Sequence, residues 1–210
     1  MMRPRSVFVL IAVAVIVGCG IWGVKRAPIE TVPEDADPEV KMDMLEKMKA
    51  DYPDDPNLYY TLANLYYDEL MLEDAKQNFE KAIQLDPKMN KARVNLAMLL
   101  MEIDEVDSAK ALLQEAIKIN DRDAKAYTNL GLIYYADSDM ATAVKYFSKA
   151  IDIDSTCVEA HYNLGLAFAE SGLLLEAIRE WRKVIEIQPE GDIAEQAKMS
   201  LERTEKLLKQ

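Results

Sequence analysis

The pattern of apolar and polar positions changes once along the chain, near residue 26. Residues 6–24 carry no charge and are almost wholly apolar, whereas from residue 38 onward apolar residues recur every three or four positions. A helix over 6–24 would be about 28 Å long, close to the roughly 30 Å hydrocarbon core of a membrane. The later spacing is typical of helices with one buried face. The pattern predicts a membrane segment over 1–26, followed by an all-α domain.

Two interpretations of the first segment remain open. Trp22 and the basic pair that follows it suit the interface end of a single spanning anchor. Alternatively, Arg3 and Arg5 precede the apolar run, and the Ile-Val-Gly-Cys sequence at 16–19 resembles a bacterial lipoprotein signal. That resemblance implies that Cys19 becomes the lipid-bearing residue. Both interpretations tether the chain to a bacterial membrane, and the order of the segments predicts that the domain lies outside the cytoplasm, in the periplasm or another extracytoplasmic space.

The stretch between the apolar run and the regular domain divides into two parts. Residues 27–37 are acidic and contain prolines, which predicts an extended, flexible linker. Within 38–55, Val40, Met44, Leu45 and Met48 recur at helical spacing. This helix aligns with the second half of the repeat described next, so we expect a half repeat there.

A period of 34 residues runs through the domain without insertion, in four units at 56–89, 90–123, 124–157 and 158–191. Small residues recur at two positions of each unit and large apolar residues recur between them. Such repeats bury their apolar faces by stacking on one another. The first small position holds Ala63, Ala97, Gly131 and Gly165, and the second holds Ala75, Ala109, Ala143 and Ala177. A charged helix over 192–210 is expected to cap the array.

This spacing resembles the tetratricopeptide repeat family. The resemblance implies two antiparallel helices per unit, stacked into a right-handed superhelix (an α-solenoid) with a concave groove lined by the first helices. Arg93 and His161 depart from the pattern, because they occupy a position that is usually aromatic. We expect His161 to be a packing residue.

The family also implies which side chains line the groove. Asn95, Asn129 and Asn163 share one repeat position, and amides can both donate to and accept from a peptide backbone. The same residues are also compatible with an ordinary helix surface. Lys91 and Lys125 form part of a pattern that grips terminal carboxylates in related proteins, which leaves a carboxylate clamp open. The groove residues expected are Tyr60, Asn64, Tyr67, Lys91, Asn95, Met98, Lys125, Asn129, Tyr135, Tyr162 and Asn163.

Charge and composition exclude several classes of function. The net charge is −12, and no acidic residue precedes Glu30, so the domain is more acidic than the whole. An acidic surface disfavours nucleic acid. One His and two Cys are too few for most His/Cys metal sites or for a disulfide framework. Glycine-rich phosphate-binding motifs are absent from the sequence, so we expect no cofactor and no enzymatic activity.

We therefore expect a membrane-tethered scaffold that binds a protein or peptide segment and supports assembly of an envelope complex. The run 177–185 resembles accessory subunits of bacterial cytochrome c maturation, which present apocytochrome to the haem-attachment complex. The alternative is an outer-membrane lipoprotein that assists assembly of secretion, pilus or other envelope machinery. A cytoplasm-facing adaptor also remains open, and the sequence does not determine the partner or the oligomeric state.

Overall fold

The structure is a computed structural model that describes residues 25–209. Within this range it contains a short 3₁₀ helix at Ile29–Thr31, ten α-helices and no strand. The α-helices are α1 (Pro38–Met48), α2 (Pro56–Asp68), α3 (Leu72–Leu85), α4 (Asn90–Glu102), α5 (Val106–Ile119), α6 (Ala124–Ala136), α7 (Met140–Ile153), α8 (Val158–Glu170), α9 (Leu174–Ile187) and α10 (Asp192–Leu207). Between 25 and 209, every helix is too short or too polar to cross a membrane. Residues 1–24 of the expected membrane segment, Cys19 among them, lie outside the described residues.

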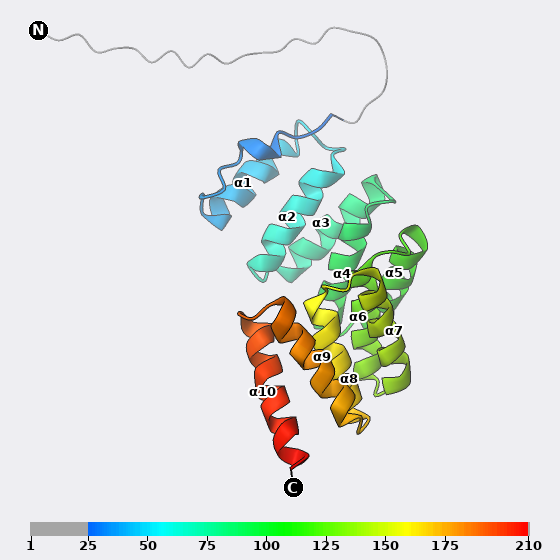
Figure 1. Cartoon of the computed structure of the whole chain (residues 1–210). Helices are drawn as coiled ribbons and strands as arrows, with labels where there is room; N and C mark the ends of the chain where they lie inside the picture. Colours follow the sequence, from blue (N-terminus) through cyan, green and yellow to red (C-terminus); the bar gives the residue numbers. More distant parts are fainter. Residues whose placement is uncertain (1–24, 210) are drawn as a thin grey trace, which may run out of the picture.

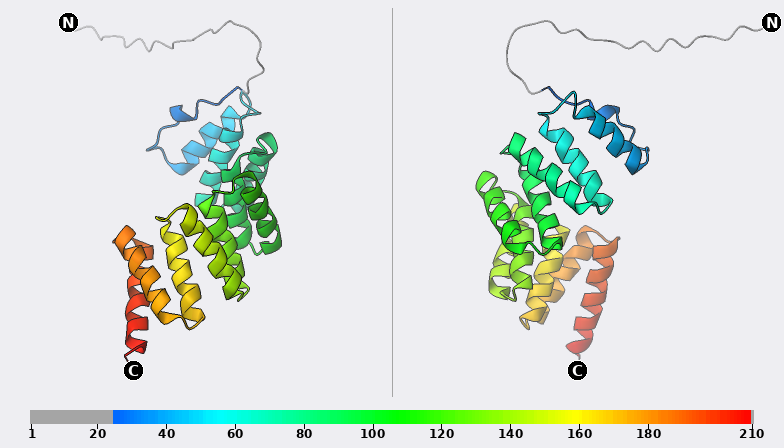
Figure 2. Two further views of the ribbon diagram at one scale, coloured as in Figure 1. Left: turned by 45° about the vertical axis from the view of Figure 1, so that its right-hand side comes forward. Right: turned by 180° about the vertical axis from the view of Figure 1, so that it is seen from behind.

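The helices form a stack of antiparallel pairs (Figure 1). Each 34-residue unit supplies one pair: α2 with α3, α4 with α5, α6 with α7, and α8 with α9. Successive pairs contact each other, so the array grows in chain order from α1 to α10, as the two further views in Figure 2 also show. At the two ends, α1 packs on α2 and α10 packs on α9. Every unit thus buries its apolar face against a neighbour or an end helix.

Each pair of helices is joined by a turn with one residue in the left-handed backbone region. This residue is Leu70, Asp104, Ser138 or Gly172, with φ between 59° and 77°. Glycine adopts this conformation without strain, and aspartate tolerates it better than most residues do. Leucine has no such advantage. Leu70 therefore does not predict the first turn from the sequence, whereas Gly172 predicts the fourth.

Close approach of the two helices within a unit depends on the small residues. The alanines at both small positions are fully buried. In the last two units the first small residue is glycine, and a Cβ at Gly131 would lie 2.5 Å from the Phe147 ring. A Cβ at Gly165 would lie 2.4 Å from Nε1 of Trp181. The aromatic side chains therefore occupy the space that a methyl group would need.

Residues 25–32 pack against α1 and α2, so the first half of the linker expected at 27–37 is not the extended spacer that its composition predicts. The backbone N–H of Ala27 donates to Oδ2 of Asp55 at 2.6 Å, and both residues are buried. Ile29 and Val32 pack against the apolar cluster between α1 and α2. The other carboxylate oxygen of Asp55 caps α2, so one side chain holds both the helix start and the incoming chain.

Two residues with basic side chains are buried, Arg93 in the second unit and His161 in the fourth. His161 is only 6% exposed, with Nδ1 2.7 Å from Glu180 Oε2 and Nε2 3.2 Å from the backbone oxygen of Ser155. The packing role expected for His161 is what the structure shows. Arg93, also 6% exposed, lies 3.7 Å from Glu115, but its Nε and one terminal nitrogen are buried without a hydrogen-bond partner. Burying such a group unpaired lowers the free energy of unfolding.

Candidate functional site

The residues expected to line the groove lie on α2, α4, α6 and α8, the first helices of the four units. These helices are neighbours, because α4 contacts α6, α6 contacts α8, and Asn95 of α4 hydrogen-bonds to Asn64 of α2. We call the surface formed by the eleven expected side chains the first-helix face. Lys91, Met98 and Lys125 are exposed on it, and the others are half-buried or, for Asn129, buried. The face therefore combines accessible charges with amides and phenols that sit deeper.

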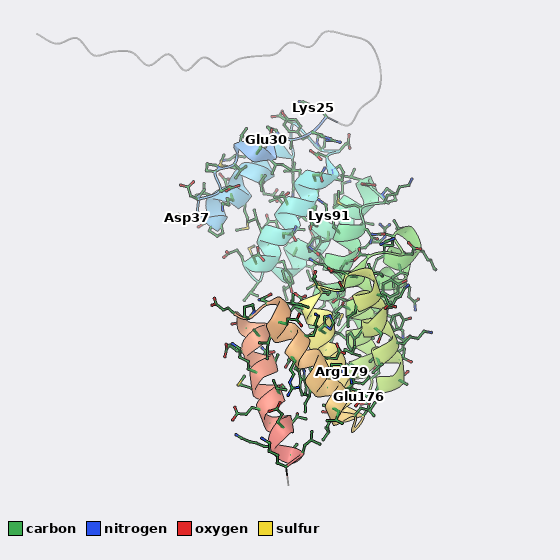
Figure 3. The ribbon with its side chains drawn as sticks, viewed as in Figure 1. Lys25, Glu30, Asp37, Lys91, Glu176 and Arg179 are labelled. Carbon is green, nitrogen blue, oxygen red and sulfur yellow. The ribbon has the colours of Figure 1, made fainter. Side chains whose placement is uncertain are left out.

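In the first two units the expected side chains hydrogen-bond to one another. Nδ2 of Asn95 donates to Oδ1 of Asn64 at 2.8 Å and to the hydroxyl of Tyr60 at 3.3 Å. Nδ2 of Asn64 in turn donates to the backbone oxygen of Tyr60 at 2.7 Å. Lys91, labelled in Figure 3, places its Nζ 4.1 Å from the centre of the Tyr60 ring. The amide groups of this half are already partnered within the protein.

In the third unit the equivalent amide has no partner. Asn129 is 8% exposed, and its Nδ2 is buried without a hydrogen bond. The reason follows from the repeat: Asn95 donates to Asn64 of the preceding unit, but the residue that corresponds to Asn64 one unit later is Met98. A thioether is only a weak acceptor. The amide nitrogen at this repeat position therefore has an acceptor in Asn95 but none in Asn129.

Two half-buried tyrosines of the first-helix face, Tyr67 and Tyr135, share one repeat position. The hydroxyl of Tyr67 donates to Glu102 of the next unit, and burial together with this hydrogen bond raises the pKa of Tyr67 to about 12. Tyr135 holds the same position two units later. Burial, the charge of Glu170 and the neighbouring Tyr162 raise its pKa. Both phenols therefore stay neutral at physiological pH, and the hydroxyl of Tyr67 contacts a carboxylate.

The repeat positions predict that these side chains share one face. They do not predict two of its features, the missing acceptor of Asn129 and the carboxylates near the tyrosines. The first feature is that Met98 leaves Asn129 without an acceptor. The alignment of Asn64 with Met98 one unit later was the sequence signal for it. The repeat positions also place Glu102 and Glu170 on the concave side, but they do not predict that these two acids act on Tyr67 and Tyr135. An acidic residue at the last position of a helix was the signal for these two.

The cavities described here lie away from the first-helix face. One of about 650 Å³ is lined by His161 and by side chains of α9, among them Leu175 and Arg182. Several of its charges are already paired, since Arg182 bonds Glu205 at 2.6 Å and His161 bonds Glu180. We regard the first-helix face as the better candidate, because it combines the unpartnered buried amide of Asn129 with accessible apolar and charged groups.

Models of the tetratricopeptide repeat match residues 69–131, 124–157 and 158–190. Together these matches run from 69 to 190, which is more than half of the chain. The chain belongs to the tetratricopeptide repeat family. The all-α repeat fold expected from the 34-residue period is thereby confirmed, and each matched range contains helix pairs that the structure describes.

Solved tetratricopeptide repeat proteins have the same fold over most of their length. A structure of MamA is 26% identical, with a TM-score of 0.67, and the match covers 79% of this chain and 97% of that one. YrrB, described as having an unusual peptide-binding site, is 25% identical, with a TM-score of 0.58 and coverage of 77% and 84%. A thermophilic tetratricopeptide repeat protein of Thermus thermophilus is 19% identical with a TM-score of 0.68, covering 78% and 90%. Curated protein sequences gave no match.

Proposed function

We propose that this tetratricopeptide repeat protein binds an extended segment of a partner protein along the first-helix face, centred on α6 and α8. The observation that carries the proposal is the buried, unpartnered Nδ2 of Asn129. A buried amide N–H without an acceptor costs about 1–3 kcal/mol. Because Nδ2 is itself buried, the Asn129 side chain would turn toward the face on binding, and a carbonyl oxygen of the bound peptide backbone would then supply the acceptor and recover that cost. The groups that would surround the peptide are Asn163, Tyr135 and Tyr162.

Binding of this kind suits a backbone more than a particular side chain. An amide can donate to and accept from any peptide unit, and the tyrosines add apolar area with a polar hydroxyl. Neighbouring helices lie about 9 Å apart, so an extended segment of about ten residues would span the four first helices. The family relation supports the proposal, since YrrB is described by its peptide-binding site.

The test uses full-length protein in detergent and a display library of random peptides. Selected peptides are titrated by fluorescence anisotropy against the unaltered chain, Asn129→Leu and a control, Gln114→Leu, on the exposed side of α5. Leucine removes the unsatisfied amide at similar volume. The urea midpoint of Asn129→Leu should therefore hold or rise while peptide affinity falls about tenfold, the loss of one buried hydrogen bond. Equal affinity for all three proteins would show that the amide takes no part in binding.

We propose further that residues 1–26 tether the domain to a membrane and that the bound segment belongs to a protein of an envelope complex. The apolar run at 6–24 supports the tether. Cytochrome c maturation is the first pathway to examine, because of the sequence resemblance of 177–185. Apocytochrome peptides that compete with the selected peptides would support this pathway. Failure of every apocytochrome segment to compete would remove it.

The alternative is a lipoprotein that assists assembly at the outer membrane, and Cys19 separates the two. In the spanning-anchor proposal, Cys19→Ala leaves membrane fractionation unchanged. In the lipoprotein alternative, the same substitution abolishes labelling by a fatty-acid analogue and releases the protein from the outer-membrane fraction.

A further inference from the structure

Acidic residues gather at the turns that join the two helices of each unit. Because the helices of a unit are antiparallel, all four of these turns fall on the same edge of the array (Figure 1). The turn segments 67–74, 101–107, 135–142 and 169–176 contain no lysine or arginine. We call them the acidic edge, and their acidic residues are Asp68, Glu69, Glu73, Asp74, Glu102, Asp104, Glu105, Asp107, Asp137, Asp139, Glu170 and Glu176.

Helix stability accounts for only part of this edge. An acidic residue in the first turn of a helix is favourable, which explains Glu73, Asp107 and Glu176 at the starts of second helices. The opposite holds at the end of a helix, where the dipole disfavours an anion. Yet α2, α4 and α8 end on an acidic residue, and α6 is followed directly by one. Each of these four helices also lacks a basic residue in its last turn.

The cations near the edge are few. Lys76 bonds Glu105 at 2.7 Å, and Lys110 lies over the ring of Tyr134 at 4.2 Å, close to Asp137. Both lysines come from second helices. Within residues 25–209, groups of three or more potential metal ligands do not occur. The edge keeps a large excess of negative charge facing solvent.

The acidic edge borders the first-helix face directly. Tyr67 donates to Glu102, and Tyr135 lies within the electrostatic reach of Glu170. Tyr135 is also on the same helix as Asn129, whose buried Nδ2 has no partner. A segment that met Asn129 would therefore run with carboxylates along one of its sides.

We propose that the segment bound on the first-helix face is rich in lysine or arginine, and that its cationic side chains contact Asp68, Asp137 and Glu170. This inference rests on the proposed function and specifies its partner. The repeated anions at helix ends lower the stability of the free protein. A basic partner would neutralise these anions by forming ion pairs with them at each unit that it crosses. The expected partner is a basic protein segment, by charge complementarity with this edge.

The probes are three synthetic peptides of about ten residues in which threonine alternates with lysine, glutamine or glutamate. Full-length protein is titrated with each peptide by fluorescence anisotropy. The edge variant carries Asp68→Asn, Asp137→Asn and Glu170→Gln. A matched control carries three substitutions at exposed acids away from the edge, Glu80→Gln, Asp152→Asn and Glu190→Gln. The two variants have the same net charge, so any general attraction of a basic peptide to an acidic protein falls equally in both.

We expect the lysine peptide to bind most tightly, the edge variant to weaken it about tenfold and the control variant to leave it unchanged, as for three exposed ion pairs. The edge variant should also show an equal or higher urea midpoint, which excludes misfolding. Equal weakening by both variants would overturn the inference. If the glutamine peptide binds as well as the lysine peptide and Asn129→Leu abolishes both, the inference fails and the proposed function stands. If the edge variant weakens lysine-peptide binding but Asn129→Leu does not, the proposed function fails at its central residue.

Discussion

Replacing Gly165 with alanine tests, at one atom, how the two helices of a unit pack. The new Cβ would lie 2.4 Å from Nε1 and 2.7 Å from Cδ1 of Trp181. Trp181 is 2% exposed, and its Nε1 donates to the backbone oxygen of Tyr162 at 3.3 Å. The ring is thus enclosed on all sides and held by a hydrogen bond. Either the ring or helix α8 must move to accept the methyl group.

Two opposing effects decide the result. Alanine is a better helix former than glycine by about 1 kcal/mol, which would stabilise the variant. Carbon atoms in contact lie about 3.5–4.0 Å apart, so the Trp181 ring must retreat by about 1 Å. Overpacking of this kind costs about 1–3 kcal/mol, and loss of the indole hydrogen bond costs about 1 kcal/mol more. We expect the free energy of unfolding to fall by about 1–3 kcal/mol.

Equilibrium urea unfolding followed by circular dichroism at the helix band measures this change. A second variant, Gly165→Ala with Trp181→Leu, recreates the combination found at Ala97 and Leu113 in the second unit. The double variant should lose less stability than the two single substitutions added together. A rise of about 1 kcal/mol for Gly165→Ala alone would show that helix propensity prevails and that the packing argument is wrong.

Three further changes are expected. Asp55→Ala removes the cap of α2 and the acceptor of the Ala27 N–H, so it should lower the free energy of unfolding by about 1–3 kcal/mol and speed hydrogen exchange at Ala27. Arg93→Tyr should raise the urea midpoint, because it removes buried nitrogens without partners. The raised pKa of Tyr67, about 12 against an ordinary 10, favours the neutral phenol in the folded state. Its contribution should hold below pH 10 and be lost between pH 10 and 12, and Tyr67→Phe should flatten that part of the stability profile.

Each of these expectations has its own check. Asp54→Ala, at the exposed neighbour, should leave both the urea midpoint and exchange at Ala27 unchanged. A lower midpoint for Arg93→Tyr would mean that the ion pair with Glu115 stabilises the unit after all. An identical loss of stability between pH 10 and 12 with and without Tyr67 would show that its hydroxyl is not coupled to folding.

The sequence predicted the array because its strongest signal is local and repeated. Small residues at fixed positions and a 34-residue period specify where helices start, touch and end, and four repetitions make that signal hard to mistake. The segment 25–32 was missed for the opposite reason. The backbone N–H of Ala27 donates a hydrogen bond to Asp55, 28 residues further along the chain. The local composition of the segment does not predict such a long-range contact.

The candidate site was predicted in outline but not in detail. Repeat positions are enough to place the amides and tyrosines on one face. They do not show which amides are satisfied, because that depends on the residue one unit earlier on a different helix. Asn64 gives Asn95 an acceptor, whereas Met98 gives Asn129 none. The alignment shows the break in the repeat, with Met98 at the position of Asn64, and the structure shows its consequence, an Asn129 Nδ2 without an acceptor.

In-cell photo-crosslinking tests most directly whether the first-helix face binds a protein segment. A photoreactive phenylalanine analogue is placed at Tyr135, on that face, or at Lys149, on the exposed side of α7. The captured proteins are identified by mass spectrometry. We predict one dominant partner, crosslinked from Tyr135 but not from Lys149, and lost when Asn129→Leu is added. Capture from Lys149 alone, or capture from Tyr135 that Asn129→Leu leaves unchanged, would contradict the account.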